Sequence, residues 1–203
     1  MKIINVDYQT NCYLVCNEET KGAFVVDCIY APFVIEAAEK EGVKIKALLV
    51  THGHYDHIMG AADLKEKTGA KIYMHESDME KIDDPRKNFC PYFKNVVKHF
   101  DVDVTVTDGD VLDLCGYKVE VMYTPGHSRG EVCYKTGDVV FAGDVIFCNS
   151  YGRYDNYDGD FASLKKSVER LLALPENTRL LCGHGEETVV AHERRTNPIL
   201  FGL

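Results

Sequence analysis

The sequence contains no tryptophan, only six prolines, and no apolar run of the length that crosses a bilayer. Its first residues, Met1 to Val6, turn polar too soon to form the apolar core of a signal peptide. We therefore expect no association with a membrane.

A Cys-x-x-Cys pair is also missing, although the chain has eight cysteines. Most of them lie in apolar runs such as 132–134 and 181–182. This pattern favours buried thiols that pack as small apolar side chains in a reducing cytosol over a disulfide framework. The expected location is therefore cytoplasmic.

Basic residues are outnumbered, with 23 Lys and Arg against 32 Asp and Glu, a net charge of -9 and a pI near 5.3. Such a surface repels a phosphate backbone, so we expect no nucleic-acid partner. The 203 residues, 45% of them hydrophobic, fit one globular domain spanning residues 1–203. Nothing in the composition indicates an oligomeric state.

Both halves of the chain alternate short strands with helices. The sheets and outer helices that this order implies predict a layered α/β sandwich. The segment 83–100 fits least well, because it mixes aromatic and cationic side chains; it is either a lid or a packed aromatic cluster. Expected strands are 11–15, 22–27, 47–50, 71–74, 110–114, 117–124, 131–135, 139–142 and 179–182, and expected helices are 32–42, 61–68, 161–174 and 189–196.

The densest chemical signal is the heptapeptide Thr51-His-Gly-His-Tyr-Asp-His57, directly after the apolar strand 47–50. His52 and His54 can point the same way because side chains alternate along an extended backbone. Asp56 and His57 then face a second point at the start of the next helix. So many buried polar rings need a partner, and a metal is the partner that these residue types prefer. We expect no such role for the isolated His75, His99 and His192.

Three further residues of metal-ligand type follow expected strands: His127, Asp144 and His184. A glycine precedes each of them, which lets the backbone turn sharply and approach a ligand closely. A repeated order of strand, glycine and ligand predicts a site built at one edge of the sheets.

Together these motifs, T-H-x-H-x-D-H, T-P-G-H, G-D and G-H, resemble the metallo-β-lactamase superfamily from Asn11 to about Pro198. The resemblance implies an αβ/βα four-layer sandwich with a dinuclear metal site. It assigns one metal to His52, His54 and His127, the other to Asp56, His57 and His184, and a bridging role to Asp144. Asp56 and Asp144 are thereby the expected catalytic carboxylates, acting as ligands.

Finer motifs narrow the choice within the superfamily. Class B β-lactamases usually have a cysteine at the position of Asp144 or an arginine at that of His57, which argues against an antibiotic hydrolase. The stretch 143–147 followed by Gly152-Arg153 is similar to glyoxalase II-like proteins, and 187–198 to the tail of short single-domain bacterial members. The C-terminal helical domain that holds glutathione in glyoxalase II has no counterpart before Leu203, so the thiol carrier stays open.

The resemblance implies hydrolysis of an S-acyl thioester, such as a hydroxyacylglutathione, as the small-molecule substrate. Two divalent ions would acidify a shared water, and the hydroxide would attack the acyl carbon. Zinc is the expected metal, with iron and manganese as alternatives. A mononuclear iron persulfide dioxygenase, a lactonase and a phosphodiesterase of the same fold remain alternative functions.

Residues around the expected metals have weaker assignments. Asp27, at the end of strand 22–27, could hydrogen-bond a ligand histidine or be an ordinary turn residue. Arg153 could bind a substrate carboxylate or form a structural salt bridge. Tyr151 and Tyr154, with Tyr157, could line the substrate pocket or belong to a tyrosine-rich surface loop.

Overall fold

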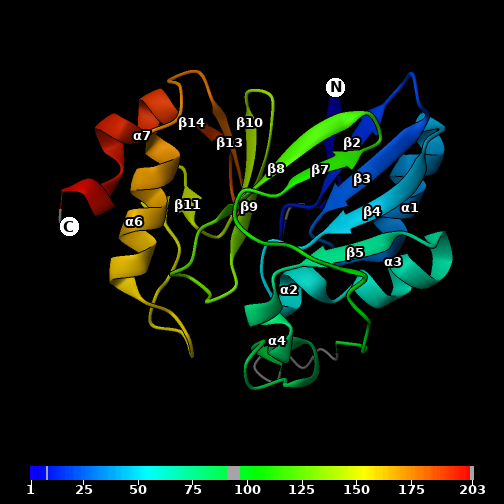
Figure 1. Cartoon of the computed structure of the whole chain (residues 1–203), viewed down its shortest axis with the longest axis horizontal. Coiled ribbons are helices and arrows are strands. Elements are labelled where there is room, and N and C mark those ends of the chain that lie inside the picture. The colour runs from blue at the N-terminus through cyan, green and yellow to red at the C-terminus, as the bar shows by residue number, and fades with distance from the viewer. Residues whose placement is uncertain (8, 91–96, 202–203) are drawn as a thin grey trace.

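Two six-stranded sheets pack face to face, with helices on the outer face of each (Figure 1). This computed structural model describes residues 1–7, 9–90 and 97–201. The first sheet has the order β1-β2-β3-β4-β5-β6 and the second the order β14-β13-β10-β9-β8-β7. The first comprises β1 (Lys2–Asn5), β2 (Tyr13–Asn17), β3 (Gly22–Val26), β4 (Lys44–Leu49), β5 (Lys71–Met74) and β6 (Val104–Thr105). The second comprises β7 (Val111–Leu114), β8 (Tyr117–Tyr123), β9 (Val132–Thr136), β10 (Val139–Gly143), β13 (Arg179–Cys182) and β14 (Thr188–Val189).

The main helices begin and end at recognisable signals. In α1 (Ala31–Glu41) a proline occupies the first turn, and Gly42 ends the helix in the left-handed conformation at φ 63°. The Asp160 side chain caps α6 (Phe161–Leu172) by accepting from the Ser163 amide at 2.7 Å. The other helical segments are α2 (Tyr55–Ile58), α3 (Ala61–Thr68), α4 (Glu80–Asp83), α7 (Val190–Thr196) and the 3-10 turns η1 (Glu76–Asp78) and η2 (Pro198–Leu200).

Alternating apolar side chains create three buried layers. In β3, Ala23 and Val25 pack under α1 and α3, whereas Phe24 and Val26 point at the second sheet. The side chains of β10 alternate in the same way: Phe141 packs against the first sheet, and Val140 packs under α6. A sheet that is apolar on both faces needs cover on both. The predicted αβ/βα four-layer sandwich is therefore confirmed.

Every expected strand and helix has a counterpart, with shifts of a few residues at its ends. Strand β4 begins at Lys44, before the apolar run 47–50. Its first half was not predicted because exposed and buried side chains alternate there. The short β1, β6, β14 and the hairpin of β11 (Ile146–Phe147) with β12 (Ser150–Tyr151) were not expected, since two to four residues carry too little periodicity. Of the segment 83–100, residues 91–96 lie outside the described residues.

Two expectations from composition can be compared with the fold. No disulfide joins any of the eight cysteines, all of which lie in described parts of the chain, and six are buried. Over those same parts, no helix combines the length and apolar character that spanning a bilayer demands.

Candidate metal centre

The loop after β4 delivers the first four residues of the centre. His52 and His54 precede α2, with His54 on extended backbone, and α2 then turns the chain so that Asp56 and His57 follow within one helical turn. His52 and His57 are completely buried and His54 nearly so. The heptapeptide thus presents side chains in two directions, as its spacing predicts.

The second sheet supplies the other three residues from the ends of its strands. His127 follows β8, Asp144 follows β10, and His184 follows β13. Strands β10 and β13 are parallel neighbours, so Asp144 and His184 emerge side by side at one edge. The loops after β4, β8, β10 and β13 therefore meet between the two sheets.

The seven side chains form two groups around Asp144. The ligand atoms of His52, His54 and His127 lie within 4.8 Å of one another and make the first group. Asp56, His57 and His184 make the second group by the same measure.

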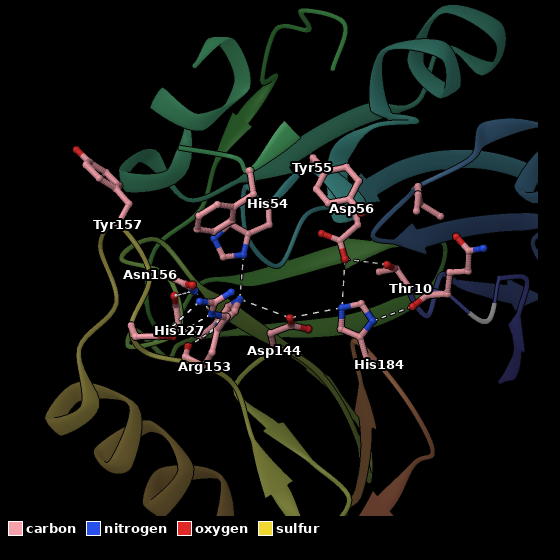
Figure 2. Close-up of a pocket in the computed structure, with 14 residues that line it drawn as sticks. Thr10, His54, Tyr55, Asp56, His127, Asp144, Arg153, Asn156, Tyr157 and His184 are labelled. Carbon is pink, nitrogen blue, oxygen red and sulfur yellow. Dashed lines mark hydrogen bonds and ion pairs between the residues drawn. The ribbon is translucent and has the colours of Figure 1, made fainter. Parts of the chain in front are cut away.

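Asp144 lies between these groups, as Figure 2 shows. One oxygen, Oδ2, is 3.4 Å from His127 Nε2 and 3.5 Å from His184 Nε2, and Oδ1 is 3.5 Å from His57 Nε2. Within the second group, Asp56 Oδ2 is 3.2 Å from His184 Nε2. Nitrogen and oxygen ligands of one tetrahedral zinc ion lie about 3.3 Å apart. The separations therefore suit ligands that share cations.

Unpartnered polar atoms provide the test of whether a metal fits. None of the described residues hydrogen-bonds His52 Nε2, His57 Nε2 or Asp144 Oδ1, although all three atoms are buried. These three residues also have ligand atoms within 4.8 Å of one another. Buried polar atoms without partners are costly, and a cation between them would remove the cost. The donor set therefore fits divalent metals.

A different cluster, Cys148, His192 and Glu193, also has ligand atoms within 4.8 Å. Its atoms are already engaged: Glu193 accepts from Thr188 and Asn197, and His192 Nε2 lies 2.8 Å from Asn149 Oδ1. This cluster therefore reads as a hydrogen-bonded anchor for α7. His75 stacks on the Tyr123 ring, and His99 pairs with Asp83 at the surface.

Asp27 anchors the metal loop from the strand next to it. Its Oδ1 accepts from the Thr51 amide at 2.8 Å, while Oδ2 accepts from the Thr51 hydroxyl at 2.7 Å and lies 2.8 Å from His57 Nδ1. Its backbone is left-handed, at φ 55°. A carboxylate in this position makes Nδ1 the protonated nitrogen of His57, which leaves Nε2 facing the centre.

Other histidines are oriented through the backbone. His127 Nδ1 lies 2.8 Å from the carbonyl oxygen of Arg153, and His184 Nδ1 lies 2.8 Å from that of Gln9. Both contacts leave Nε2 directed at Asp144. The Thr10 hydroxyl donates to Asp56 Oδ2 at 2.9 Å, which fixes the second carboxylate. The N-terminal segment before β2 therefore supports the second group.

The two groups differ in their electrostatics. Burial lowers the pKa of His52, of His54 and of His127, which keeps the first group neutral. Burial also lowers the pKa of His57, but Asp56, Asp144 and Asp27 outweigh it and raise that pKa to about 10. Asp56 belongs to the second group, and Asp144 contacts two histidines of that group but one of the first, so more of the negative charge of the centre lies at the second group.

Gly183 makes the approach of His184 possible. A Cβ at this position would lie 2.2 Å from Asp144 Oδ1 and 2.9 Å from His57 Cε1. We predict that Gly183→Ala displaces Asp144 and reduces metal affinity by roughly 10- to 100-fold, as a misplaced ligand shell does. Titration of the metal-free protein with metal should reveal the lower affinity. Gly185→Ala cannot serve as the control, because a side chain at the Gly185 φ of 73° strains the backbone. Unchanged affinity with a native fold would contradict the close contact.

A pocket of about 720 Å³ opens onto the centre. Phe89 forms part of its wall and packs on the His54 ring at 4.9 Å. Arg153 lies over the Phe89 ring, with Cζ 6.0 Å from the ring centroid, and holds Asp155 through Nε at 2.9 Å and Nη2 at 3.2 Å. The lining side chains are Gln9, Thr10, Ile29, His54, Tyr55, Asp56, Phe89, His127, Asp144, Arg153, Asp155, Asn156, Tyr157 and His184.

The expected substrate roles of Tyr151 and Tyr154 stay predictions. Their rings lie beside Phe161 of α6, at 6.3 and 4.8 Å between centroids, and neither residue is among those that line this pocket. Tyr157 does line it. Arg153 lines the pocket and forms a salt bridge with Asp155 there, and its expected binding of a substrate carboxylate stays a prediction.

A carboxylate that was not predicted from the sequence lies beneath the centre. Glu131 is fully buried, accepts from the Asp144 amide at 2.8 Å, and has Oε1 3.6 Å from His52 Nδ1. Burial and the nearby Asp144 raise its pKa well above the ordinary value. A charged residue opening the apolar run 131–134 was the available signal, because such a residue is seldom buried without a role.

Comparisons with known proteins give the same frame. A family model described as "Metallo-beta-lactamase superfamily" matches residues 5–184. An uncharacterised protein of Mycobacterium leprae is 35% identical over 96% of this chain and 95% of its own length. A hydroxyacylglutathione hydrolase of Haemophilus influenzae is 31% identical over 95% of this chain and 93% of its own.

Solved structures are similar over nearly the whole chain. A B3 metallo-β-lactamase, BLEG-1, superposes with a TM-score of 0.91 at 32% identity, covering 98% of both chains. A protein solved in a di-iron-bound form gives 0.84 at 32%, covering 98% of this chain and 99% of its own. ETHE1 from Myxococcus xanthus gives 0.81 at 26%, covering 98% and 84%. By its fold and by a family match over most of its length, the chain belongs to the metallo-β-lactamase superfamily.

Proposed function

We propose that this protein is a metal-dependent thioester hydrolase that cleaves S-acyl substrates of the hydroxyacylglutathione kind. The observation that carries the proposal is the position of Asp144, between two groups of three ligand residues and at the floor of an open pocket. His52, His54 and His127 would hold one divalent ion, Asp56, His57 and His184 a second, and Asp144 would contact both.

The residues of the centre divide the work. When bound, the ions supply a Lewis acid for the acyl carbonyl and a water acidic enough to react near neutral pH. Asp27, Arg153 and Gln9 hold the Nδ1 atoms of His57, His127 and His184, so each ring keeps one tautomer. A thiolate leaves without prior protonation, so the pocket needs no general acid beside the centre.

Pocket chemistry supports a substrate with an apolar and an anionic part. Ile29, Tyr55 and Phe89 offer apolar walls, and Arg153 offers a guanidinium fork. The Arg153 side chain is 61% exposed, and exposed ion pairs are weak, so a substrate carboxylate could replace Asp155 in the fork. The similarity to a hydroxyacylglutathione hydrolase supports a glutathione-like thiol, which carries such carboxylates.

Removing the fork should weaken binding more than turnover. We predict that Arg153→Ala raises KM about tenfold for a thioester with free carboxylates, because one charged hydrogen bond is worth about 1.5 kcal/mol. The kcat should change little. Arg86→Ala is a matched control, since Arg86 holds Asp84 in the same two-residue arrangement outside the pocket. An unchanged KM in Arg153→Ala would show that Arg153 does not bind the substrate.

Steady-state assays with defined metal loading test the proposal. S-lactoylglutathione and other acyl thiols should be hydrolysed, and a chelator should abolish turnover. Two alternatives belong in the same panel. The likeness to ETHE1 favours a persulfide dioxygenase, which would consume oxygen with glutathione persulfide and one iron. The likeness to BLEG-1 favours β-lactam hydrolysis, which a chromogenic cephalosporin would report. If no thioester is hydrolysed while persulfide oxidation or β-lactam hydrolysis is observed, the proposal is wrong.

Metal identity is part of the same experiment. Imidazole and carboxylate ligands suit zinc, iron and manganese. The similarity to a di-iron-bound protein makes iron a serious candidate beside zinc. Loading the metal-free protein with each ion and measuring turnover with bound stoichiometry should identify which pair supports hydrolysis.

A further inference from the structure

A lysine with no solvent exposure lies behind the centre. Lys81 in α4 and Asp78 in η1 each have an exposed fraction of 0%, and so does the side chain of Asp158. The Lys81 ammonium donates to Asp78 Oδ1 at 2.6 Å, to Asp158 Oδ2 at 2.6 Å and to Ser128 Oγ at 2.7 Å. All three hydrogens of the ammonium are therefore used. Such a buried charge cluster is costly to assemble, which calls for a reason beyond stability.

Asp78 connects this lysine to both ligand loops of the first group. Its Oδ2 accepts from the amide of Gly53, the residue between His52 and His54, at 2.7 Å. Its Oδ1 accepts from the Gly130 amide at 2.7 Å and from the Ser128 hydroxyl at 2.6 Å, in the loop that begins with His127. Neither glycine tolerates a side chain here, because a Cβ on Gly53 or Gly130 would lie within 3 Å of this cluster.

Asp158 connects the same lysine to the substrate side of the pocket. It lies in the loop 152–160, which also carries Arg153, Asn156 and Tyr157, all of which line the pocket. Its Oδ2 also accepts from the Arg129 amide at 3.0 Å. Other contacts also fix the loop to the segment around His127. Arg153 O lies 2.8 Å from His127 Nδ1, Asn156 Nδ2 donates to the His127 carbonyl at 3.1 Å, and the Asp160 amide donates to the Gly126 carbonyl at 2.8 Å.

The backbone of Lys81 connects to the part of the pocket lining that Tyr55 and Phe89 form. Its carbonyl accepts from Asn88 Nδ2 at 2.7 Å, and the Asn88 carbonyl accepts from the Tyr55 amide at 2.9 Å. Asn88 precedes Phe89, which lines the pocket at a left-handed φ of 64°. Lys81 therefore contacts three supporting residues: Asp78 beside the first ligand group, Asp158 in the loop of Arg153, and Asn88 beside Phe89.

We propose that Lys81 is a positioning residue that sets the distance between the metal centre and the substrate-binding loop. Its ammonium binds two carboxylates that hold opposite parts: Asp78 holds the backbone around the first ligand group, and Asp158 holds the loop of Arg153. The affinity for metal and the affinity for substrate should then both depend on one ammonium group that contacts neither the metal nor the substrate. The substrate part of this inference rests on the proposed hydrolase function, whereas the metal part does not.

Two variants separate these arms. Lys81→Met keeps the length of the side chain and removes the ammonium; we expect metal affinity to fall, and KM to rise, each by roughly 10- to 100-fold, the usual effect of losing a partner behind a metal ligand. Asp158→Ala leaves Lys81 paired with Asp78; we expect wild-type metal affinity and a KM raised about tenfold. Lys65→Met is the control, because Lys65 Nζ donates two hydrogen bonds, at 2.8 Å each, and Lys65 does not line the pocket.

Metal titration and hydrogen exchange supply readouts that need no substrate. In Lys81→Met the Gly53 and Gly130 amides should exchange faster, whereas in Asp158→Ala only residues 152–159 and the Arg129 amide should. A general loss of stability would instead speed exchange throughout and leave metal affinity unchanged. If Lys81→Met folds with wild-type metal affinity and unchanged exchange at both glycines, the proposal is wrong. If it does not fold, Asp158→Ala decides: unchanged exchange across 152–159 overturns the proposal. Inactive wild-type protein would refute only the hydrolase assignment.

Discussion

Replacing Asp144 with asparagine is expected to reduce kcat/KM by roughly 1,000-fold or more, because this carboxylate would contact both ions. Its oxygens lie 3.4 to 3.5 Å from ligand nitrogens of His127, His184 and His57, and Oδ1 accepts no hydrogen bond from the described residues. The amide has nearly the same shape but no charge. Bound metal, measured by mass spectrometry after gel filtration, should fall below that of the wild type.

A matched variant isolates the site from the loss of one negative charge. Asp113→Asn removes a carboxylate that pairs with Lys118 at the surface, where both side chains are about two-thirds or more exposed. It should bind metal and turn over substrate as the wild type does. Two ions retained by Asp144→Asn at wild-type affinity would refute the bridging position.

Asp27→Asn is expected to reduce the metal affinity of the second group by roughly 10- to 100-fold while the chain still folds. Asparagine tolerates the left-handed backbone at φ 55°, so the turn itself should survive. One end of the carboxylate binds the Thr51 amide and the other end binds the Thr51 hydroxyl and His57. If the oxygen stays on the Thr51 amide, the new NH₂ group faces the protonated nitrogen of His57, and the ring must turn.

Calorimetric titration with zinc should resolve this as a weaker second binding event beside an unchanged first. Asp108→Asn is the control, because Asp108 also accepts from a backbone amide, that of Tyr123, and from a cation, Arg170, but at the surface. Equal weakening of both events would show that Asp27 acts on the whole loop through Thr51, and no weakening would contradict its role.

Local signals allowed the layers and the seven candidate ligands to be predicted. Apolar runs such as 47–50 are readable because a strand buried on both faces has no polar positions. The heptapeptide 51–57 is readable because ligand spacing within one turn of chain is local information. The glycine before His184 has its reason in the structure, where Asp144 fills the space a side chain would need.

Contacts between distant segments were not predictable in the same way. Lys81 pairs with Asp158 across 77 positions, and neither residue has a sequence environment that distinguishes it from a surface charge. The placement of Tyr151 and Tyr154 was not predictable either, because sequence does not tell on which side of a loop a ring lies; both rings lie beside Phe161. The substrate roles of Arg153 and Tyr157 stay predictions.

The division of the ligands along the chain has a consequence for folding. Residues 51–57 approach from the first sheet, whereas His127, Asp144 and His184 approach from the second. Ions held between them would act as staples that join the two sheets, although the chain has no disulfide to do so. Because neither half alone offers a complete set, the binding energy would become available only after the halves have docked, and it would add directly to the stability of the assembled sandwich.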